Sequence, residues 1–232
     1  MSAPRLPVAL ALVAFALVAR PVAQEGVRES DRLKEAIVVL DEIMGADDKA
    51  VPRSILEKAE AIAVFPGMVK AGFVFGGSFG RGAISVRDPK TGAWSSPGFL
   101  TIAGGSLGLQ IGAEAVDLVL VVQNRRGLDQ LLQNQFKIGA DAGVAAGPVG
   151  RDASAATDIQ MRAQILTYSR TRGVFAGITV VGSTIHQDRD ANERFYGTAY
   201  RTTQIVTQHL GGSPEPSGAW KAALAKYAGG TP

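Results

Sequence analysis

A glycine-rich stretch from Phe65 to Gly112 constrains the fold more than any other part of this chain. It holds twelve of the 28 glycines and contains the pattern Gly-Gly-Ser-apolar-Gly twice, at Gly76–Gly80 and at Gly104–Gly108. Glycine loses more backbone entropy than other residues in regular structure, so this density needs a geometric reason such as curvature or close backbone approach. The stretch therefore predicts two strongly curved strands of one sheet, related by a short internal repeat.

Side-chain alternation supports the strand interpretation. In the second copy, Leu107, Leu109 and Ile111 alternate with small or polar residues, and in the first copy Phe75 and Phe79 alternate with glycine and serine. A period of two is typical of a strand whose two faces differ. We expect the two strands to lie in one antiparallel sheet, and we expect the bare glycine face to let another element, or a ligand, sit close.

The remaining chain predicts short helices and further strands around this sheet. Helices are expected at Gln24–Gly45, Val51–Ala61, Arg125–Asn134, Thr203–Leu210 and Ser217–Ala228, and a short helix or turn is expected at Asp188–Tyr196. Further strands are expected at Ile62–Phe65, Asp117–Gln123, Phe136–Ala146, Met161–Arg170 and Val174–Ile185. The fold class is therefore α+β: a single domain with a curved glycine-rich antiparallel β-sheet, partly barrel-like, flanked by short helices.

Two local patterns add detail. In the first helix, Leu33, Ile37, Leu40 and Met44 fall on one face, and the opposite face is charged and expected to be solvated. The strand Ile62–Phe65 is expected to end at Pro66-Gly67, since this pair favours a turn.

Residues 1–23 have the pattern of a secretory signal. Arg5 gives a positive start, Val8–Ala19 is an apolar run, and Ala19 or Ala23 ends a plausible cleavage site. The run is shorter than a membrane-spanning helix usually requires, although an uncleaved anchor is the alternative. We expect an exported protein, periplasmic or extracellular, with peripheral association to a membrane.

Charge and cysteine content narrow the function classes. Residues 1–23 contain two basic residues, Arg5 and Arg20, and no acidic residue. The rest of the chain therefore has 22 Lys and Arg, from a total of 24, and 21 Asp and Glu. Residues 24–61 hold six basic and ten acidic side chains, whereas residues 62–232 hold sixteen and eleven. The excess of basic over acidic residues in 62–232 is too small to indicate a nucleic-acid-binding protein. The chain has no cysteine, which excludes disulfides, thiolate metal sites and a cysteine nucleophile.

The repeated Gly-x-Ser-x-Gly also matches the nucleophile motif of serine hydrolases. A serine esterase would use Ser78 or Ser106 with His186 as the base. The orienting carboxylate would be Asp117, Asp141 or Asp152. We favour strand curvature as the explanation, because alternation continues after each serine and no helix follows, and we therefore expect no enzymatic activity.

Other site chemistries have weaker support. His186, Asp188 and Asp190 lie close in sequence but fit no zinc or calcium spacing, and no cofactor-binding glycine motif occurs in its required context. We expect neither a metal nor a cofactor. Asp117 and Asp141 lie among apolar and small residues, so we expect them to pair with Arg151 or with backbone N–H groups, or to line a polar cavity.

Five blocks of sequence resemble the SYLF domain, a lipid-binding family. They are AIAVFPGMVKAGFVFGGSFGRG at Ala61–Gly82, Trp94–Asn124, FKIGADAGVAAGPVGR at Phe136–Arg151, YSRTRGVFAGITVVG at Tyr168–Gly182 and DANERFYG at Asp190–Gly197. The resemblance implies a compact α+β domain that binds phosphoinositide or another anionic lipid. Actin binding belongs to the yeast members and is not expected for an exported chain. Some eukaryotic relatives use a basic N-terminal segment for lipid, whereas residues 24–61 are acidic here.

These observations give a working domain plan and a set of lipid-binding candidates. The plan is a signal peptide at 1–23, a SYLF-like domain at 24–200 and a helical tail with a Gly/Pro linker at 201–232. Arginine and lysine at loop ends suit phosphate groups. The candidates are Lys70, Arg81, Arg125, Arg126, Lys137, Arg151, Arg170 and Arg172. The predicted function is non-enzymatic binding to an anionic phospholipid surface; the alternatives are the serine esterase and an envelope scaffold that binds proteins.

Overall fold

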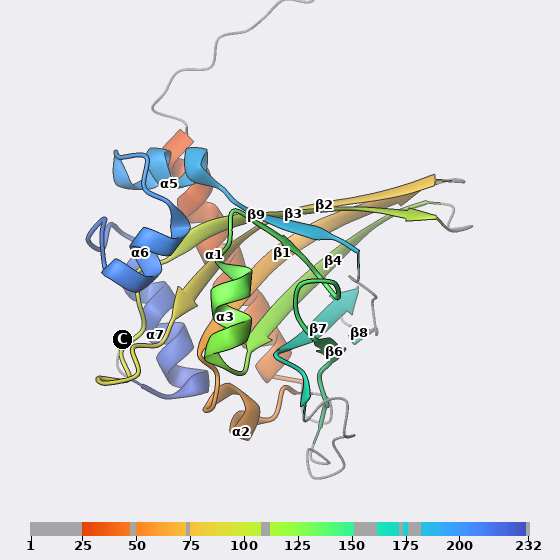
Figure 1. Ribbon diagram of the computed structural model, residues 1–232, viewed down its shortest axis with the longest axis horizontal. Helices are drawn as coiled ribbons and strands as arrows, with labels where there is room; N and C mark the ends of the chain where they lie inside the picture. Colours follow the sequence, from red (N-terminus) through yellow and green to blue (C-terminus); the bar gives the residue numbers. More distant parts are fainter. Residues whose placement is uncertain are drawn as a thin grey trace, which may run out of the picture.

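A strongly curled sheet of nine strands forms the centre of the computed structural model (Figure 1). The structure describes residues 25–46, 50–72, 75–107, 112–150, 162–171, 174–175 and 182–230. The strand order is β5-β9-β3-β2-β1-β4-β7-β6, and β8 pairs with β7. The strands are β1 Ala61–Gly72, β2 Phe75–Val86, β3 Gly98–Leu107, β4 Gly112–Val122, β5 Gln135–Lys137, β6 Val144–Ala146, β7 Ile165–Thr171, β8 Val174–Phe175 and β9 Thr184–Gln187.

The predicted α+β class with a curved, partly barrel-like sheet is confirmed. One pair differs from the prediction, because β6 and β7 run parallel and make the sheet mixed. The predicted strand Phe136–Ala146 divides into β5 and β6, with turn backbone at residues 139–141 between them. Gly139 has a φ of +84°, a value that a glycine adopts without strain and that breaks the strand there.

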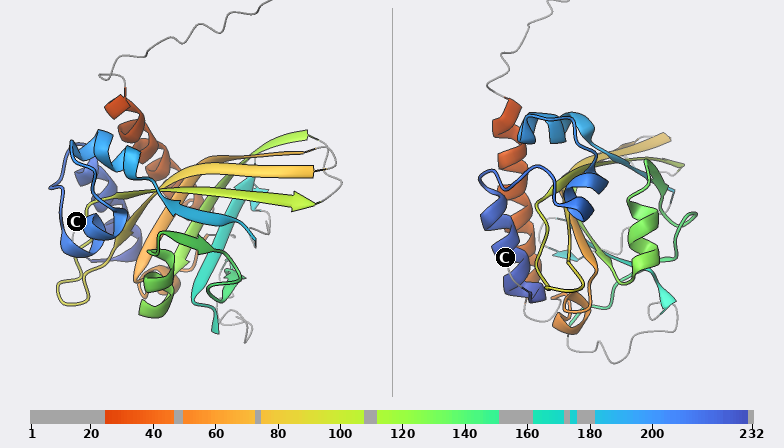
Figure 2. Two further views of the ribbon diagram at one scale, coloured as in Figure 1. Left: turned by 45° about the horizontal axis from the view of Figure 1, so that its top comes forward. Right: turned by 60° about the vertical axis from the view of Figure 1, so that its left-hand side comes forward.

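Helices cover both faces of the sheet, as the right-hand view of Figure 2 shows for α1 and α7 on one side and α3 on the other. The helices are α1 Glu25–Met44, α2 Arg53–Leu56, α3 Arg125–Leu131, α5 Arg189–Tyr196, α6 Thr202–Gln208 and α7 Ser217–Ala228. We call the face under α1 and α7 the outer face, and the face under α3 and α6 the inner face. Across the described ranges, no helix is long and apolar enough to span a bilayer.

Each face carries its own hydrophobic cluster. The inner cluster joins Phe65, Met68 and Ile102 of the sheet to Leu128 of α3 and Ile205 of α6. The outer cluster packs α1 and α7 on the other side of the same strands, and its members include Leu33, Leu40, Phe99, Tyr168 and Trp220. A strand covered on both faces is apolar on both parities, and the buried residues 118–122 of β4 have this pattern.

The two copies of the glycine repeat pair with each other. Gly76 lies opposite Ser106 and Ser78 opposite Gly104 in the β2–β3 register. At Gly82, on the inner face, a Cβ would lie 2.5 Å from the carbonyl oxygen of Val64 and 2.6 Å from Cδ1 of Phe65, so strand β1 and the Phe65 ring approach there more closely than a side chain would allow. The expectation that glycine admits a close neighbour is therefore confirmed, and that neighbour is the aromatic core.

Pro66-Gly67 does not end a strand, contrary to the prediction. Strand β1 continues to Gly72, and its pairing with β4 shifts between Phe65 and Met68. Pro66 and Gly67 form the bulge at this shift, where a residue without a ladder N–H and a residue at positive φ are both tolerated. The bulge keeps Phe65 and Met68 on the same, inner face of the sheet.

The buried face of α1 is rotated from the predicted one. Leu33 and Leu40 are buried as expected, whereas Ile37 is only partly buried and Ala36 and Ile43 take its place in the core. The rotation also buries Glu29 and Arg32, so the prediction of a fully solvated charged face is wrong for these two residues. Both side chains form ion pairs, as their burial requires.

The contact between α1 and α7 predicts a loss of stability in acid. Tyr227 Oη and Lys226 Nζ donate hydrogen bonds to Asp41 and hold the pKa of its carboxyl below the ordinary 3.8. A lowered folded-state pKa stabilises the protein above pH 3.8, and this stabilisation is lost as the pH falls through the folded-state pKa. Urea unfolding from pH 7 to pH 3 should show a steeper acid loss for the wild type than for Asp41→Asn. Equal slopes would contradict this role of Asp41.

Candidate functional site

Strands β1 to β4 extend well beyond the helices and form a projecting sheet (Figures 1 and 2). On its outer face, four apolar residues lie side by side in register, one from each strand. Val69 pairs with Phe79 and with Ala115, and Phe79 pairs with Ala103. All four are exposed, Val69 at 51% and Phe79 at 49% of their surface. We call Val69, Phe79, Ala103 and Ala115 the apolar row.

The surroundings of the apolar row are small on one side and basic on the other. Toward the strand tips, the next register level places Ala71 opposite Gly77 and Gly77 opposite Gly105. Toward the helices, the Arg81 guanidinium carbon lies 5.7 Å from the centre of the Phe79 ring. The apolar row therefore contains one half-exposed aromatic ring and has a cation at its border.

The inner face at the same level is polar. Lys70 lies opposite both Ser78 and Glu114, and Ser78 Oγ donates a hydrogen bond of 3.4 Å to the carbonyl of Gly104. Burial lowers the pKa of Lys70, and the charge of Glu114 opposes this shift. Lys70 and Arg81, two of the predicted lipid ligands, thus lie on opposite faces of the projecting sheet.

The other predicted cations that the structure describes do not gather on one face. Arg170 bridges helix α1 to strand β4 through ion pairs with Glu42 and, at 3.2 Å, with Asp117. Arg125 pairs with Asp129 at 2.9 Å within α3. Arg126 on α3 and Lys137 on β5 are exposed, and Arg151 and Arg172 lie outside the described residues. The described cations therefore offer Arg81 alone beside the apolar row.

The two aspartates have the predicted structural role toward backbone N–H groups. Asp117 accepts a hydrogen bond of 2.9 Å from the backbone N–H of Gly67, and so fixes the bulge in β1. Asp141 accepts one from the backbone N–H of Lys137. The arginine directly opposite Asp117 is Arg170 of β7, and the other expected partner, Arg151, lies outside the described residues.

The geometry does not assemble Ser78 and His186, one of the two pairs of the alternative esterase hypothesis; the side chain of Ser106, the other serine, lies outside the described residues. Phe99 lies in the outer cluster, so Thr101, two residues on, faces outward, and His186 pairs with Thr101. Ser78 shares the inner parity of Gly80, whose Cβ position would touch Met68 and Ile102. Ser78 and His186 thus occupy opposite faces of the sheet. The motif serves strand pairing here.

Asp188, one of the three residues considered as metal ligands, has structural partners instead. Its carboxylate accepts a hydrogen bond of 3.1 Å from the backbone N–H of Ala191 and so caps α5. The same group binds Arg32 at 3.2 Å. Within the described ranges, no group of three or more His, Asp and Glu side chains is arranged to hold a metal ion.

The exposure of Val69 and Phe79 was not foreseen from the sequence. Alternation shows that Phe79 and the glycines face opposite ways, but it does not tell which face is covered. The glycines are a usable signal for this exposure. If the face of the strand that carries the glycines is buried, the large side chains of the same strand lie on the opposite face.

Comparison with known proteins assigns the family. Residues 103–227 match the Ysc84 family model, described as "Las17-binding protein actin regulator". The chain is 31% identical over 186 residues to LAS seventeen-binding protein 3 of Saccharomyces cerevisiae, covering 79% of this chain and 40% of that protein. It is 33% identical over 171 residues to SH3 domain-containing YSC84-like protein 1 of Rattus norvegicus, covering 73% of this chain and 49% of that protein.

These matches define a class of domain. In this chain the class is a curled α+β domain, and the matched segment spans less than half the length of each of these relatives. The chain belongs to the Ysc84 family, the SYLF-domain family that its sequence blocks resemble.

Proposed function

We propose that the chain is an exported, non-enzymatic protein that binds anionic lipid membranes peripherally through the apolar row and Arg81. The observation that carries this proposal is the half-exposed pair Val69 and Phe79 in the middle of a projecting sheet face. Contiguous exposed apolar surface next to polar residues is typical of a binding face. Export is supported by the signal-like residues 1–23.

The residue types at this face suit a membrane surface. A phenylalanine ring can enter the headgroup boundary while the neighbouring guanidinium stays at the level of the phosphates. Full burial of a phenylalanine contributes about 1.5–3 kcal/mol, so the exposed half of Phe79 contributes about 1 kcal/mol. One interfacial arginine adds about 1 kcal/mol on an anionic surface. We therefore expect weak, reversible binding with a large apolar component.

Substitution of Phe79 is the direct test. Flotation of the chain with neutral and with anionic vesicles should show that Phe79→Ser lowers the bound fraction on both, by about fivefold in partition coefficient. Arg81→Ala should lower binding to anionic vesicles alone, also by about fivefold, and this effect should vanish in high salt.

A matched control is available on α1. Val38 is 53% exposed, as much as Val69, but lies on the solvent side of the helix. Val38→Ser should leave flotation unchanged. If Val38→Ser and Phe79→Ser behave alike, or if the wild type does not float with anionic vesicles, the lipid proposal is refuted.

A protein partner is the second candidate, favoured by the family description as actin regulators that bind Las17. The apolar row would then be a docking surface for filamentous actin itself, the partner that the words "actin regulator" suggest. Co-sedimentation with filamentous actin distinguishes the two functions, because a lipid-binding face predicts no pelleting with actin and a protein-docking face predicts pelleting that Phe79→Ser abolishes.

A further inference from the structure

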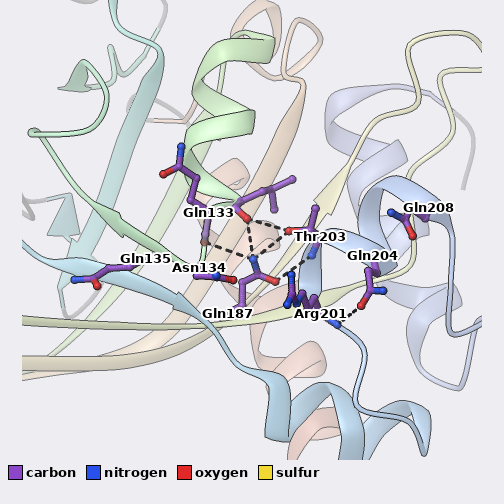
Figure 3. Close-up of a pocket in the computed structure, with 9 residues that line it drawn as sticks. Gln133, Asn134, Gln135, Gln187, Arg201, Thr203, Gln204 and Gln208 are labelled. Carbon is purple, nitrogen blue, oxygen red and sulfur yellow. Dashed lines mark hydrogen bonds between the residues drawn. The ribbon is translucent and has the colours of Figure 1, made fainter.

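A groove of about 650 Å³ lies between the end of α3, strand β9 and helix α6 (Figure 3). Among the described residues that line it, side-chain amides dominate, Arg201 is the one cation, and there is no carboxylate. The side chains at its rim are Gln133, Asn134, Gln135, Arg201, Gln204 and Gln208. Such a volume is typical of a site for a small ligand or a short segment.

The floor of the groove is held rigidly by Gln187. Its Nε2 donates to the carbonyl of Leu132 at 2.8 Å and to Thr203 Oγ1 at 3.1 Å, and its Oε1 accepts from the backbone N–H of Thr203 at 3.2 Å. These bonds join the end of α3 to the start of α6. Both polar atoms of the Gln187 amide are thus used inside the protein. At the rim, Gln204 Oε1 accepts a hydrogen bond of 2.9 Å from the backbone N–H of Arg201, so Gln204 offers a ligand its NH2 group.

Strand β5, at one wall of the groove, is an edge of the sheet. The backbone N–H of Lys137 bonds to Asp141, on the side away from β9. Backbone groups alternate sides along a strand, so the N–H and C=O of Gln135 also point away from β9. The turn at residues 140–141 satisfies the carbonyl of Lys137. Within the described part of the chain, the backbone of Gln135 thus forms the open part of this edge.

We propose that this groove binds an extended peptide segment that carries an acidic side chain. The segment pairs with the open backbone of Gln135, as a strand added to a sheet edge does. The rim amides, which both donate and accept, bond to its main chain, and Arg201 pairs with its carboxylate. This site is separate from the apolar row and does not depend on the membrane proposal.

The lining favours a peptide over other neutral ligands. The described lining of the groove has no aromatic side chain on which a sugar ring or a nucleobase would stack. A peptide main chain instead offers donors and acceptors at the spacing of a neighbouring strand. The single arginine selects for an acidic over a basic side chain.

Titration of the isotope-labelled chain, followed by amide NMR signals, tests the proposal. The probe is a blocked hexapeptide of alternating threonine and glutamate, with the threonine–lysine hexapeptide and maltotriose for comparison. We expect the acidic peptide at millimolar concentration to shift the signals of the groove residues, while the other two probes leave them unchanged. Arg201→Gln should weaken binding about fivefold.

Two variants connect the binding to the groove. Gln135→Pro removes the outward N–H and retains the ladder bonds to β9, so it should weaken binding about fivefold while thermal unfolding stays near the wild-type value. Arg126→Gln, at the far end of α3, is the matched control for Arg201→Gln and should have no effect. If Gln135→Pro impairs folding, the comparison of peptide binding by Arg201→Gln and by Arg126→Gln decides whether the groove is the binding site. Absence of shifts at the groove, equal binding of the lysine peptide, or binding of maltotriose alone overturns the proposal.

Discussion

Replacing Glu29 by alanine is expected to lower the free energy of unfolding by about 3–5 kcal/mol. Glu29 is fully buried, and its Oε1 accepts hydrogen bonds from Arg194 at 2.8 and 3.2 Å. The same atom lies 3.6 Å from Arg32, which also pairs with Asp188 at 3.2 Å. Without Glu29, the 6% exposed side chain of Arg32 loses one of its two carboxylates in a buried site.

These ion pairs form a network that joins α1 to α5. Burial lowers the pKa of Arg32, and the charges of Asp188 and Glu29 oppose this shift. Removal of one carboxylate therefore leaves a desolvated cation only partly compensated.

Urea denaturation is the measurement for Glu29, with Glu35→Ala as the control because Glu35 is exposed on the same helix. Glu29→Gln should fall between the wild type and Glu29→Ala, since an amide oxygen still accepts from Arg194 but carries no charge. A loss below about 1 kcal/mol for Glu29→Ala would show that the network contributes no more than a surface pair does.

The contrast between α1 and the projecting sheet shows what the sequence could predict. The helix itself follows from its periodicity, and the curved strands follow from glycine density and alternation. The burial of Glu29 does not follow, because it depends on Arg194, which lies 165 residues away and reaches α1 only in the folded chain. Local pattern gives the element, whereas long-range pairing decides which face is covered.

The same limit applies to the candidate site. The sequence identifies basic residues at loop ends, but these residues can bind one lipid surface together only if their side chains lie on the same face of the domain. Arg170 is occupied because β7 places it beside Asp117, and Lys70 faces inward because the bulge at Pro66 and Gly67 changes the parity of β1. The apolar row depends on register across four strands, which no single strand reveals.

Replacing Trp220 by alanine is the second change with a large expected effect, about 3–5 kcal/mol lost from the free energy of unfolding. Trp220 is fully buried in the outer cluster, where α7 packs against α1 and the sheet. Its indole Nε1 donates to Ser85 Oγ at 2.8 Å, and Ser85 Oγ donates to the carbonyl of Ser95 at 2.9 Å. The residue thus anchors α7 both by volume and by hydrogen bonding.

Two variants separate these contributions. Trp220→Phe keeps most of the apolar volume and removes the indole N–H, so it should cost less than Trp220→Ala, with about 1 kcal/mol assigned to the hydrogen bond. Lys221→Ala, next along α7, should change stability by less than about 0.5 kcal/mol. If urea denaturation showed that Trp220→Ala lowers the free energy of unfolding no more than Lys221→Ala does, α7 would not contribute to the stability of the sheet. A large, cooperative loss would instead make α7 part of the same folding unit as the sheet, because the helix that covers the outer face would then be required for the strands beneath it.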